Sequence, residues 1–282
     1  MSHPIHPQTR MGRIALTVGS LDRSLAYYQT SIGLTVHRHE GSTAVLGSGN
    51  EELLVLTENK NGRPTRNTTG LYHFALLVPS RLDLGRVLYN LIQTQTPVGG
   101  FADHAVSEAI YLTDPDGHGI EIYRDRPRSE WEYPNGSLRL VTEPFDAEGV
   151  LGELQGHDPT FTGMKPETTI GHTHLHVANI RQAEAFYNGI LGFDLMARYG
   201  PSASFVAAGG YHHHLGLNTW AGIGAPPPDP DTWHLQWYEI ITPDLEAVQE
   251  RLETADIPHT RTDTTLHVAD PSQNNIRITK GT

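Results

Sequence analysis

Histidine and carboxylate side chains are the residues of this chain that could do chemistry. Its 282 residues include 17 His and 32 Asp or Glu, but no Cys. The lack of Cys excludes disulfides, thiolate zinc sites, iron–sulfur clusters and Cys nucleophiles, so any metal must be bound through His nitrogens and carboxylate oxygens. His is also the side chain that exchanges a proton near neutral pH. We therefore expect some of the His residues to be metal ligands or acid–base groups.

The charge and hydropathy of the chain exclude several classes of function. The formal charge at pH 7 is −12, from 20 Lys and Arg against 32 Asp and Glu, and this excess of negative charge repels phosphate backbones. We therefore expect no nucleic-acid partner. No apolar run approaches the ~18 residues of a membrane span, and the N-terminal residues lack the basic and apolar regions of a secretory signal. We expect no membrane insertion and a cytoplasmic location.

Internal repeats show which elements must position the His and carboxylate residues. Residues 13–34 reappear without a gap as residues 172–193, and both segments read as a strand, a turn and a helix. A weaker repeat relates residues 73–92 to residues 237–255, again a strand leading into a helix. Two short alternating runs follow each of the later helices, with Asp-Pro at matching places, and such runs are typical of strands.

The first repeat also predicts where its helices begin and end. Ser20 and Asn179 each precede a helix and can accept hydrogen bonds from its free backbone N–H groups. Gly33 and Gly192 follow the two helices, where glycine tolerates the left-handed conformation that ends a helix.

Four βαβββ modules follow from these repeats. Modules one to four cover, in order, residues 11–57, 70–125, 169–219 and 234–280. A chain of 282 residues exceeds the ~100 to 200 that are usual for one domain. We therefore expect an α+β protein with one domain at 8–126, a second at 168–282, and a Pro-containing connection at 127–167.

This arrangement resembles the vicinal oxygen chelate superfamily, which includes glyoxalases, bleomycin resistance proteins and extradiol dioxygenases. The resemblance covers nearly the whole chain. It implies that βαβββ modules pair into curved mixed sheets, here forming two cups, and that a cup holds a divalent metal. It also implies that the metal ligands come from the first and last strands of a module.

The superfamily positions select a ligand set in modules two and three. In module two they fall on His73 and Glu121, and in module three on His172, which shares one face of its strand with His174 and His176. His174 therefore remains an alternative to His172. A set of two His and one carboxylate binds one face of an octahedral Fe(II) and leaves up to three positions for substrate and O₂. Mn(II) prefers a similar site.

The corresponding positions of modules one and four carry no metal ligands. Module one has Arg13 there, and module four has Trp237 and Arg277. Neither Arg nor Trp can ligate a metal. In typical two-domain extradiol enzymes modules three and four build the site. The ligands of this chain instead predict that module two pairs with module three, while modules one and four close an empty, structural cup.

Two further segments resemble extradiol ring-cleaving dioxygenases of the catechol 2,3-dioxygenase type. The end of module two, from Tyr111 to Glu121, matches a family ending in which an active-site Tyr precedes the Glu ligand by ten residues. Residues 210–218 resemble the family segment with an acid–base His, and the alignment selects His213, with its two His neighbours as alternatives. The family's other catalytic His lies nine residues before the Tyr, whereas His104 lies seven before it.

These residues suit the chemistry that the resemblance implies. A catechol must lose protons when it binds the metal, and an oxygen intermediate must gain one as the ring is attacked. A His such as His213, poised near neutral pH, suits both steps. Tyr111 can donate a preorganised hydrogen bond to an oxygen of the substrate or of an intermediate.

The expected function is therefore an Fe(II)-dependent extradiol dioxygenase that inserts both atoms of O₂ into a small aromatic diol. A glyoxalase-like isomerase or lyase is one alternative, although such enzymes usually hold a non-redox metal with four protein ligands. A metal-free protein that sequesters a small molecule in its cup is another, and it would leave the His73, Glu121 and His172 set without a role.

Overall fold

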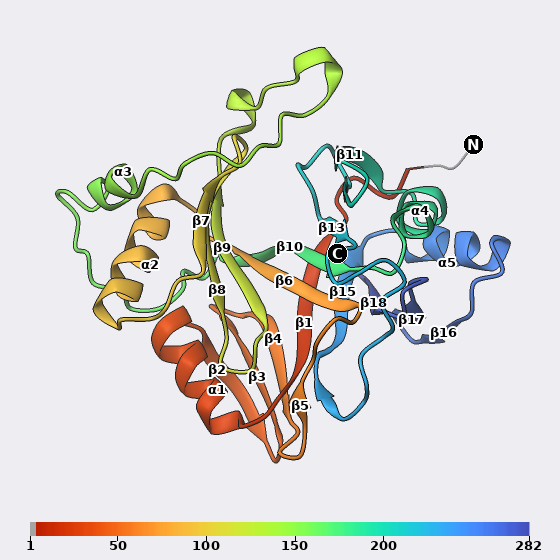
Figure 1. The fold of residues 1–282 in the computed structure, drawn as a ribbon, viewed down its shortest axis with the longest axis horizontal. Coiled ribbons are helices and arrows are strands. Elements are labelled where there is room, and N and C mark those ends of the chain that lie inside the picture. Colours follow the sequence, from red (N-terminus) through yellow and green to blue (C-terminus); the bar gives the residue numbers. More distant parts are fainter. Residues whose placement is uncertain (1–3, 282) are drawn as a thin grey trace. The chain divides into compact units, whose positions relative to one another are not determined.

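The structure is a computed structural model that describes residues 4–281. Residues 1–3, on which part of the prediction of no secretory signal rests, and residue 282, where the second predicted domain ends, lie outside the described residues. The strands form two eight-stranded sheets and one two-stranded sheet. The helices alternate with groups of strands along the chain (Figure 1). The α+β class expected from the repeats is confirmed. Within residues 4–281, no helix is both long and apolar enough to span a membrane.

All four βαβββ modules are present, each with a first strand, a helix and three further strands. Module one holds β1 (Arg10–Val18), α1 (Leu21–Tyr27), η1 (Tyr28–Ile32), β2 (Thr35–Glu40), β3 (Thr43–Ser48) and β4 (Glu51–Glu58). Module two holds β6 (Gly70–Leu77), α2 (Arg81–Gln93), β7 (Gly100–Asp103), β8 (Ser107–Thr113) and β9 (Gly119–Asp125). Module three holds β10 (Thr169–His176), α4 (Ile180–Glu184), η4 (Ala185–Ile190), β11 (Asp194–Tyr199), β12 (Ala203–Ala207) and β13 (Leu215–Asn218). Module four holds β15 (Leu235–Thr242), α5 (Leu245–Thr254), β16 (His259–Thr262), β17 (Thr265–Ala269) and β18 (Asn275–Lys280).

The remaining elements lie between modules. They are β5 (Arg63–Pro64), η2 (Arg128–Glu130), η3 (Pro134–Gly136), α3 (Ala147–Gly152) and β14 (Thr232–Trp233). The sequence predicted no helix in 127–167, but α3 forms there after Asp146, whose carboxylate accepts a hydrogen bond from the Gly149 backbone N–H at 2.9 Å. Helix α3 packs beside α2 (Figure 1). The domain boundaries at 8–126 and 168–282 stay a prediction.

The strand order shows which modules share a sheet. One sheet has the order β16-β17-β18-β15-β1-β4-β3-β2, and the other has the order β11-β12-β13-β10-β6-β9-β8-β7. Modules one and four therefore form one sheet, and modules two and three form the other. This is the pairing expected from the positions of the candidate ligands.

The chain packs into two compact units. The first takes in Met1–Thr17, Arg63–Tyr72 and Gly171–Thr282, as far as these ranges are described, and the second takes in Val18–Gly62 and His73–Ile170. Both units contain buried apolar residues, contributed by their strands and their helices.

The same buried Tyr–Asp contact occurs once in each compact unit. In the second unit the Tyr28 hydroxyl donates to Asp114 at 2.9 Å. In the first unit the Tyr187 hydroxyl donates to Asp270 at 2.8 Å and lies 2.7 Å from the Tyr238 hydroxyl. Burial, followed by the charge of the Asp, raises the pKa of both Tyr28 and Tyr187 well above the usual value. Each hydroxyl therefore stays protonated and links a helix to the turn that precedes the last strand of a module.

Candidate metal centre

Three neighbouring strands of one sheet position the candidate ligands. His73 lies on β6, Glu121 on β9 and His172 on β10. Strands β6 and β9 run parallel, with Ala75 opposite Glu121, so the carboxylate comes from the strand beside that of His73. All three ligand candidates are buried. A buried carboxylate is costly unless hydrogen bonds or a cation compensate its charge.

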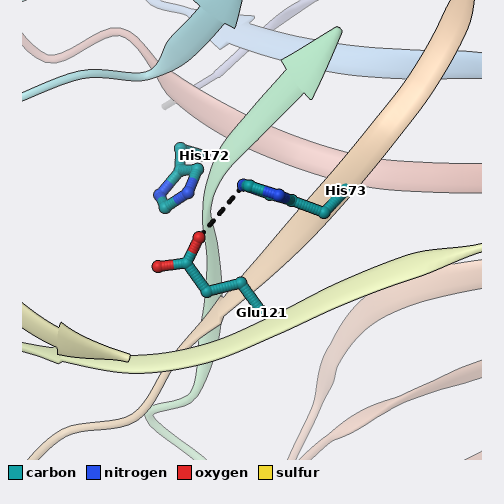
Figure 2. A group of neighbouring side chains, drawn as sticks. All are labelled: His73, Glu121 and His172. Carbon is teal, nitrogen blue, oxygen red and sulfur yellow. Dashed lines mark ion pairs between the residues drawn. The ribbon is translucent and has the colours of Figure 1, made fainter. Parts of the chain in front are cut away.

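The three side chains converge. His73 Nε2 lies 3.0 Å from Glu121 Oε2, and His73, Glu121 and His172 each offer one ligand atom within 4.8 Å of the others (Figure 2). Among residues 4–281 this is the only group of three such side chains. Metal–nitrogen and metal–oxygen bonds of about 2 Å bring the ligand atoms of one ion to about 3–4 Å from each other. The donor types, their burial and their spacing therefore fit a divalent metal after small rotations of the side chains.

The structure distinguishes His172 from its two strand neighbours. The ring of His174 packs among aromatic side chains, 5.1 Å from Tyr72 and 5.4 Å from Trp220 between ring centroids. Nδ1 of His176 lies 2.7 Å from Oδ1 of Asn218. Of the three His residues on β10, which all lie within the described residues, only His172 belongs to the candidate metal-binding group. Asn218 was not foreseen, since its contact depends on the pairing of β10 with β13.

The candidate acid–base residue His213 lies beside His172. Their ring centroids are 4.1 Å apart, and Nδ1 of His213 is 2.7 Å from Nδ1 of His212. His213 therefore turns toward His212, whereas successive residues of a regular strand would point to opposite faces. Residues 211–214 precede β13 and are not part of a strand, so the alternation does not apply to them. The His214 ring points away from the His212–His213 pair, because its Nδ1 accepts a hydrogen bond from the Ala208 backbone N–H at 3.1 Å.

Tyr111 and His104 form a hydrogen-bonded pair beside His73. His104 Nδ1 lies 2.5 Å from the carbonyl oxygen of Val141, and its Nε2 lies 2.7 Å from the Tyr111 hydroxyl. Since a carbonyl oxygen can only accept, Nδ1 carries a proton, and in the neutral ring Nε2 accepts from the Tyr hydroxyl. The Tyr111 ring centroid lies 5.6 Å from that of His73. His104 lies seven residues before Tyr111 instead of the nine that are usual in the family, but its ring still reaches the Tyr111 hydroxyl.

The position of Tyr111 follows from the register of two antiparallel strands. Strands β8 and β9 pair Tyr111 directly with Glu121, and directly opposed residues point to the same face of a sheet. The ten-residue separation in sequence thus becomes a contact across one hairpin. Val141 lies in the predicted connection, and nothing in the sequence indicated that its carbonyl oxygen would hold His104.

Comparisons with known proteins agree with this architecture. The family model of the Glyoxalase/Bleomycin resistance protein/Dioxygenase superfamily matches residues 10–122 and 169–278. A protein of Bacillus subtilis (strain 168) named Catechol-2,3-dioxygenase is 44% identical over 275 residues, which are 95% of this chain and 95% of that protein.

Solved structures support the fold alone, because their sequences are distant. A structure from Bacillus subtilis subsp. subtilis strain 168 has a TM-score of 0.68 at 12% identity and covers 99% of this chain and 86% of its own. Glyoxalase I from Zea mays has a TM-score of 0.59 at 17% identity and covers 97% of this chain and 92% of its own. The family match over most of the chain and the 44% identity of the Bacillus subtilis protein lead to one conclusion: the chain belongs to the glyoxalase/bleomycin resistance protein/dioxygenase superfamily.

Proposed function

We propose that this protein is an extradiol dioxygenase that uses Fe(II) to insert both atoms of O₂ into the ring of a small aromatic diol. The observation that carries the proposal is the buried group of His73, Glu121 and His172, with Tyr111 and His213 beside two of its members. The 44% identity with a protein named Catechol-2,3-dioxygenase, over nearly all of both chains, supports the same chemistry.

His73, Glu121 and His172 are the proposed metal ligands. Two neutral imidazoles and one carboxylate suit Fe(II) or Mn(II), and three ligands on one face leave positions for other molecules. When bound, Fe(II) would supply a site at which a diol and O₂ meet and exchange electrons. Among the described residues the group has three members, whereas glyoxalase-like isomerases usually use four.

His213 is the proposed base for the diol. Its Nδ1 faces Nδ1 of His212 at 2.7 Å, so one of the two nitrogens carries the proton between them. When His213 donates that proton, the neutral ring has its lone pair on Nε2 and can accept a proton from a diol hydroxyl there. In that tautomer, with its Nδ1–H donating to His212, His213 can act as a base.

Tyr111 is the proposed contact to an oxygen of the substrate. In the neutral state its hydroxyl donates to His104 Nε2 and can accept from a diol hydroxyl. If His104 takes up a proton, its Nε2–H donates to the Tyr oxygen and the Tyr hydroxyl is released to donate to the substrate. Such a donor, fixed in place before the reaction, contributes most when negative charge develops on the oxygen.

The test is anaerobic loading with Fe(II), followed by metal quantification, O₂ uptake and visible absorbance with catechol and substituted catechols. We expect about one iron per chain, consumption of O₂, and a yellow ring-opened product. Tight metal binding without O₂ uptake would contradict the proposal and indicate an isomerase or lyase. A protein that retains neither Fe(II) nor Mn(II) would contradict it in favour of a metal-free binding protein.

A further inference from the structure

The sheet of modules one and four contains a cavity that the metal chemistry does not use. Its volume is about 450 Å³, and its walls come from β15 to β18 and the residues before β16, all in the first compact unit. Its volume lies within the range of about 300–1,000 Å³ found for small-molecule sites. The side chains around it include Trp237, His267 and Arg277.

The strand register places charged groups together on one face of this sheet. Arg277 on β18 lies opposite Glu239 on β15 and opposite His267 on β17. Trp237 is two residues before Glu239 and so shares its face. The Arg277 guanidinium carbon lies over the Trp237 ring, 3.7 Å from its centre, a cation–π contact.

Glu239, the acidic residue opposite Arg277, is already compensated. Arg13 Nε donates to Glu239 Oε2 at 3.0 Å, and Arg13 Nη2 donates to Oε1 at 3.1 Å. The Arg13 backbone N–H also donates to Oε2, at 3.1 Å, and the Thr279 hydroxyl donates to Oε1 at 2.9 Å. Burial opposes ionisation of Glu239, but the hydrogen bonds from Arg13 outweigh it, and the pKa of this carboxyl lies below its usual value.

Arg277 keeps its positive charge without such a partner. Among residues 4–281 it has no hydrogen bond or ion pair to an acidic side chain, and it stacks on the Trp237 ring. Burial, followed by the nearby charge of Arg13, lowers the pKa of Arg277, and the charge of Glu239 offsets this only in part. A guanidinium has five N–H donors in a planar fork, the shape that matches the two oxygens of a carboxylate.

We propose that this cavity binds a small organic carboxylate, with the carboxylate paired to Arg277 and its carbon skeleton in the rest of the cavity. Pro258, Ala269 and Ile276 line that remaining space, and a cavity of about 450 Å³ is far larger than an inorganic anion requires. The position that carries the negatively charged Glu121 in module two therefore carries the positively charged Arg277 in module four. Glu121 is placed to hold a cation, whereas Arg277 at the matching place holds an anion.

The test is calorimetric titration of the full-length protein with sodium benzoate, in a buffer free of other carboxylates. We expect one saturable site, about tenfold or more weaker in Arg277→Met, and little binding of benzyl alcohol, which has the same ring without the charge. Arg198→Met is the matched control, because Arg198 is an exposed residue of the same unit that pairs with Glu184. Glu121→Gln reports whether benzoate uses the metal centre instead.

A second readout does not depend on the folding of the variant. In protein labelled with ¹⁵N-Trp, the indole N–H signal of Trp237, identified by Trp237→Phe, should shift as benzoate is added. Unchanged heats in Arg277→Met, equal binding of benzyl alcohol, loss of binding in Glu121→Gln, or a Trp237 signal that does not move would each overturn the proposal. Catechol turnover by Arg277→Met should stay at the wild-type rate.

Discussion

The two eight-stranded sheets are built from the same module but carry different chemistry at matching strand positions. In the sheet of modules two and three, His73 and Glu121 lie on neighbouring strands and belong to the buried candidate metal-binding group. In the sheet of modules one and four, the matching places hold Trp237 and Arg277, which stack on one another. Helix caps and the buried Tyr–Asp contacts recur in both halves of the chain. The comparison shows that one module frame carries different side chains at matching places on its first and last strands, and the two binding proposals rest on these side chains.

The largest effect is expected from exchanging a proposed ligand. Glu121→Gln keeps the shape of the side chain but removes the charge that a divalent metal requires, so metal content and catechol turnover should both fall close to zero. Metal quantification and O₂ uptake measure this, and Arg277→Met is the control at the matching position of the other sheet. If Glu121→Gln retained its metal and Arg277→Met lost it, the metal site would lie in the sheet of modules one and four instead.

Removal of the proposed base should slow turnover while the metal stays bound. For His213→Gln we expect kcat to fall about 10² to 10⁴-fold, the usual range for general acid–base catalysis, with metal content unchanged. The control is His214→Gln, because the His214 ring is held by the Ala208 backbone N–H. If His213→Gln instead lost its metal, His213 would be a ligand and the three-residue set would be incomplete.

A buried carboxylate–arginine cluster should make each sheet sensitive to acid. Glu108 is fully buried and accepts hydrogen bonds from Arg81 at 2.9 and 3.0 Å and from Arg124 at 2.6 Å. Burial opposes its ionisation, but these arginines hold the pKa of Glu108 below its usual value, and Arg13 does the same for Glu239. A depressed carboxyl pKa stabilises the fold above the unfolded-state value, about 4.3, and this contribution is lost as the pH falls through the folded-state pKa.

Urea unfolding followed between pH 7 and pH 3 measures this contribution. Glu108→Gln should lower the free energy of unfolding at pH 7 by about 3 kcal/mol, because two arginines lose their buried partner, and should flatten the decline in acid. Glu239→Gln, in the other sheet, should also lower the free energy of unfolding at pH 7 and flatten its decline in acid. A steeper acid decline in either variant than in the wild type would contradict the assignment.

The smallest effects are expected at the repeated Tyr–Asp contacts. Tyr187→Phe removes a hydroxyl that contacts both Asp270 and Tyr238, whereas Tyr28→Phe removes a single contact to Asp114. At about 1 kcal/mol per hydrogen bond, the free energy of unfolding should fall by about 2 and 1 kcal/mol respectively. Equal losses, measured by urea unfolding at pH 7, would show that the Tyr238 contact adds nothing.

The helix ends were readable from the sequence because they depend on neighbouring residues. The Ser20 and Asn179 side chains accept hydrogen bonds from the backbone N–H groups three residues on, and Gly33 and Gly192 have positive φ angles of 85° and 87°. The π-helical turns η1 and η4 were not foreseen, since their hydrogen-bond pattern leaves no distinct periodicity in five or six residues.

The sequence by itself determined the four modules, the α+β class and the short list of His and carboxylate candidates, because these follow from local periodicity, capping and residue type. Only the tertiary structure decided that His172 and not His174 joins His73 and Glu121, and that His104 reaches Tyr111 while bonded to Val141. It also showed that Arg13 compensates Glu239 and leaves Arg277 on Trp237. These outcomes depend on strand pairing and side-chain contacts between residues far apart in the chain, which no local pattern records.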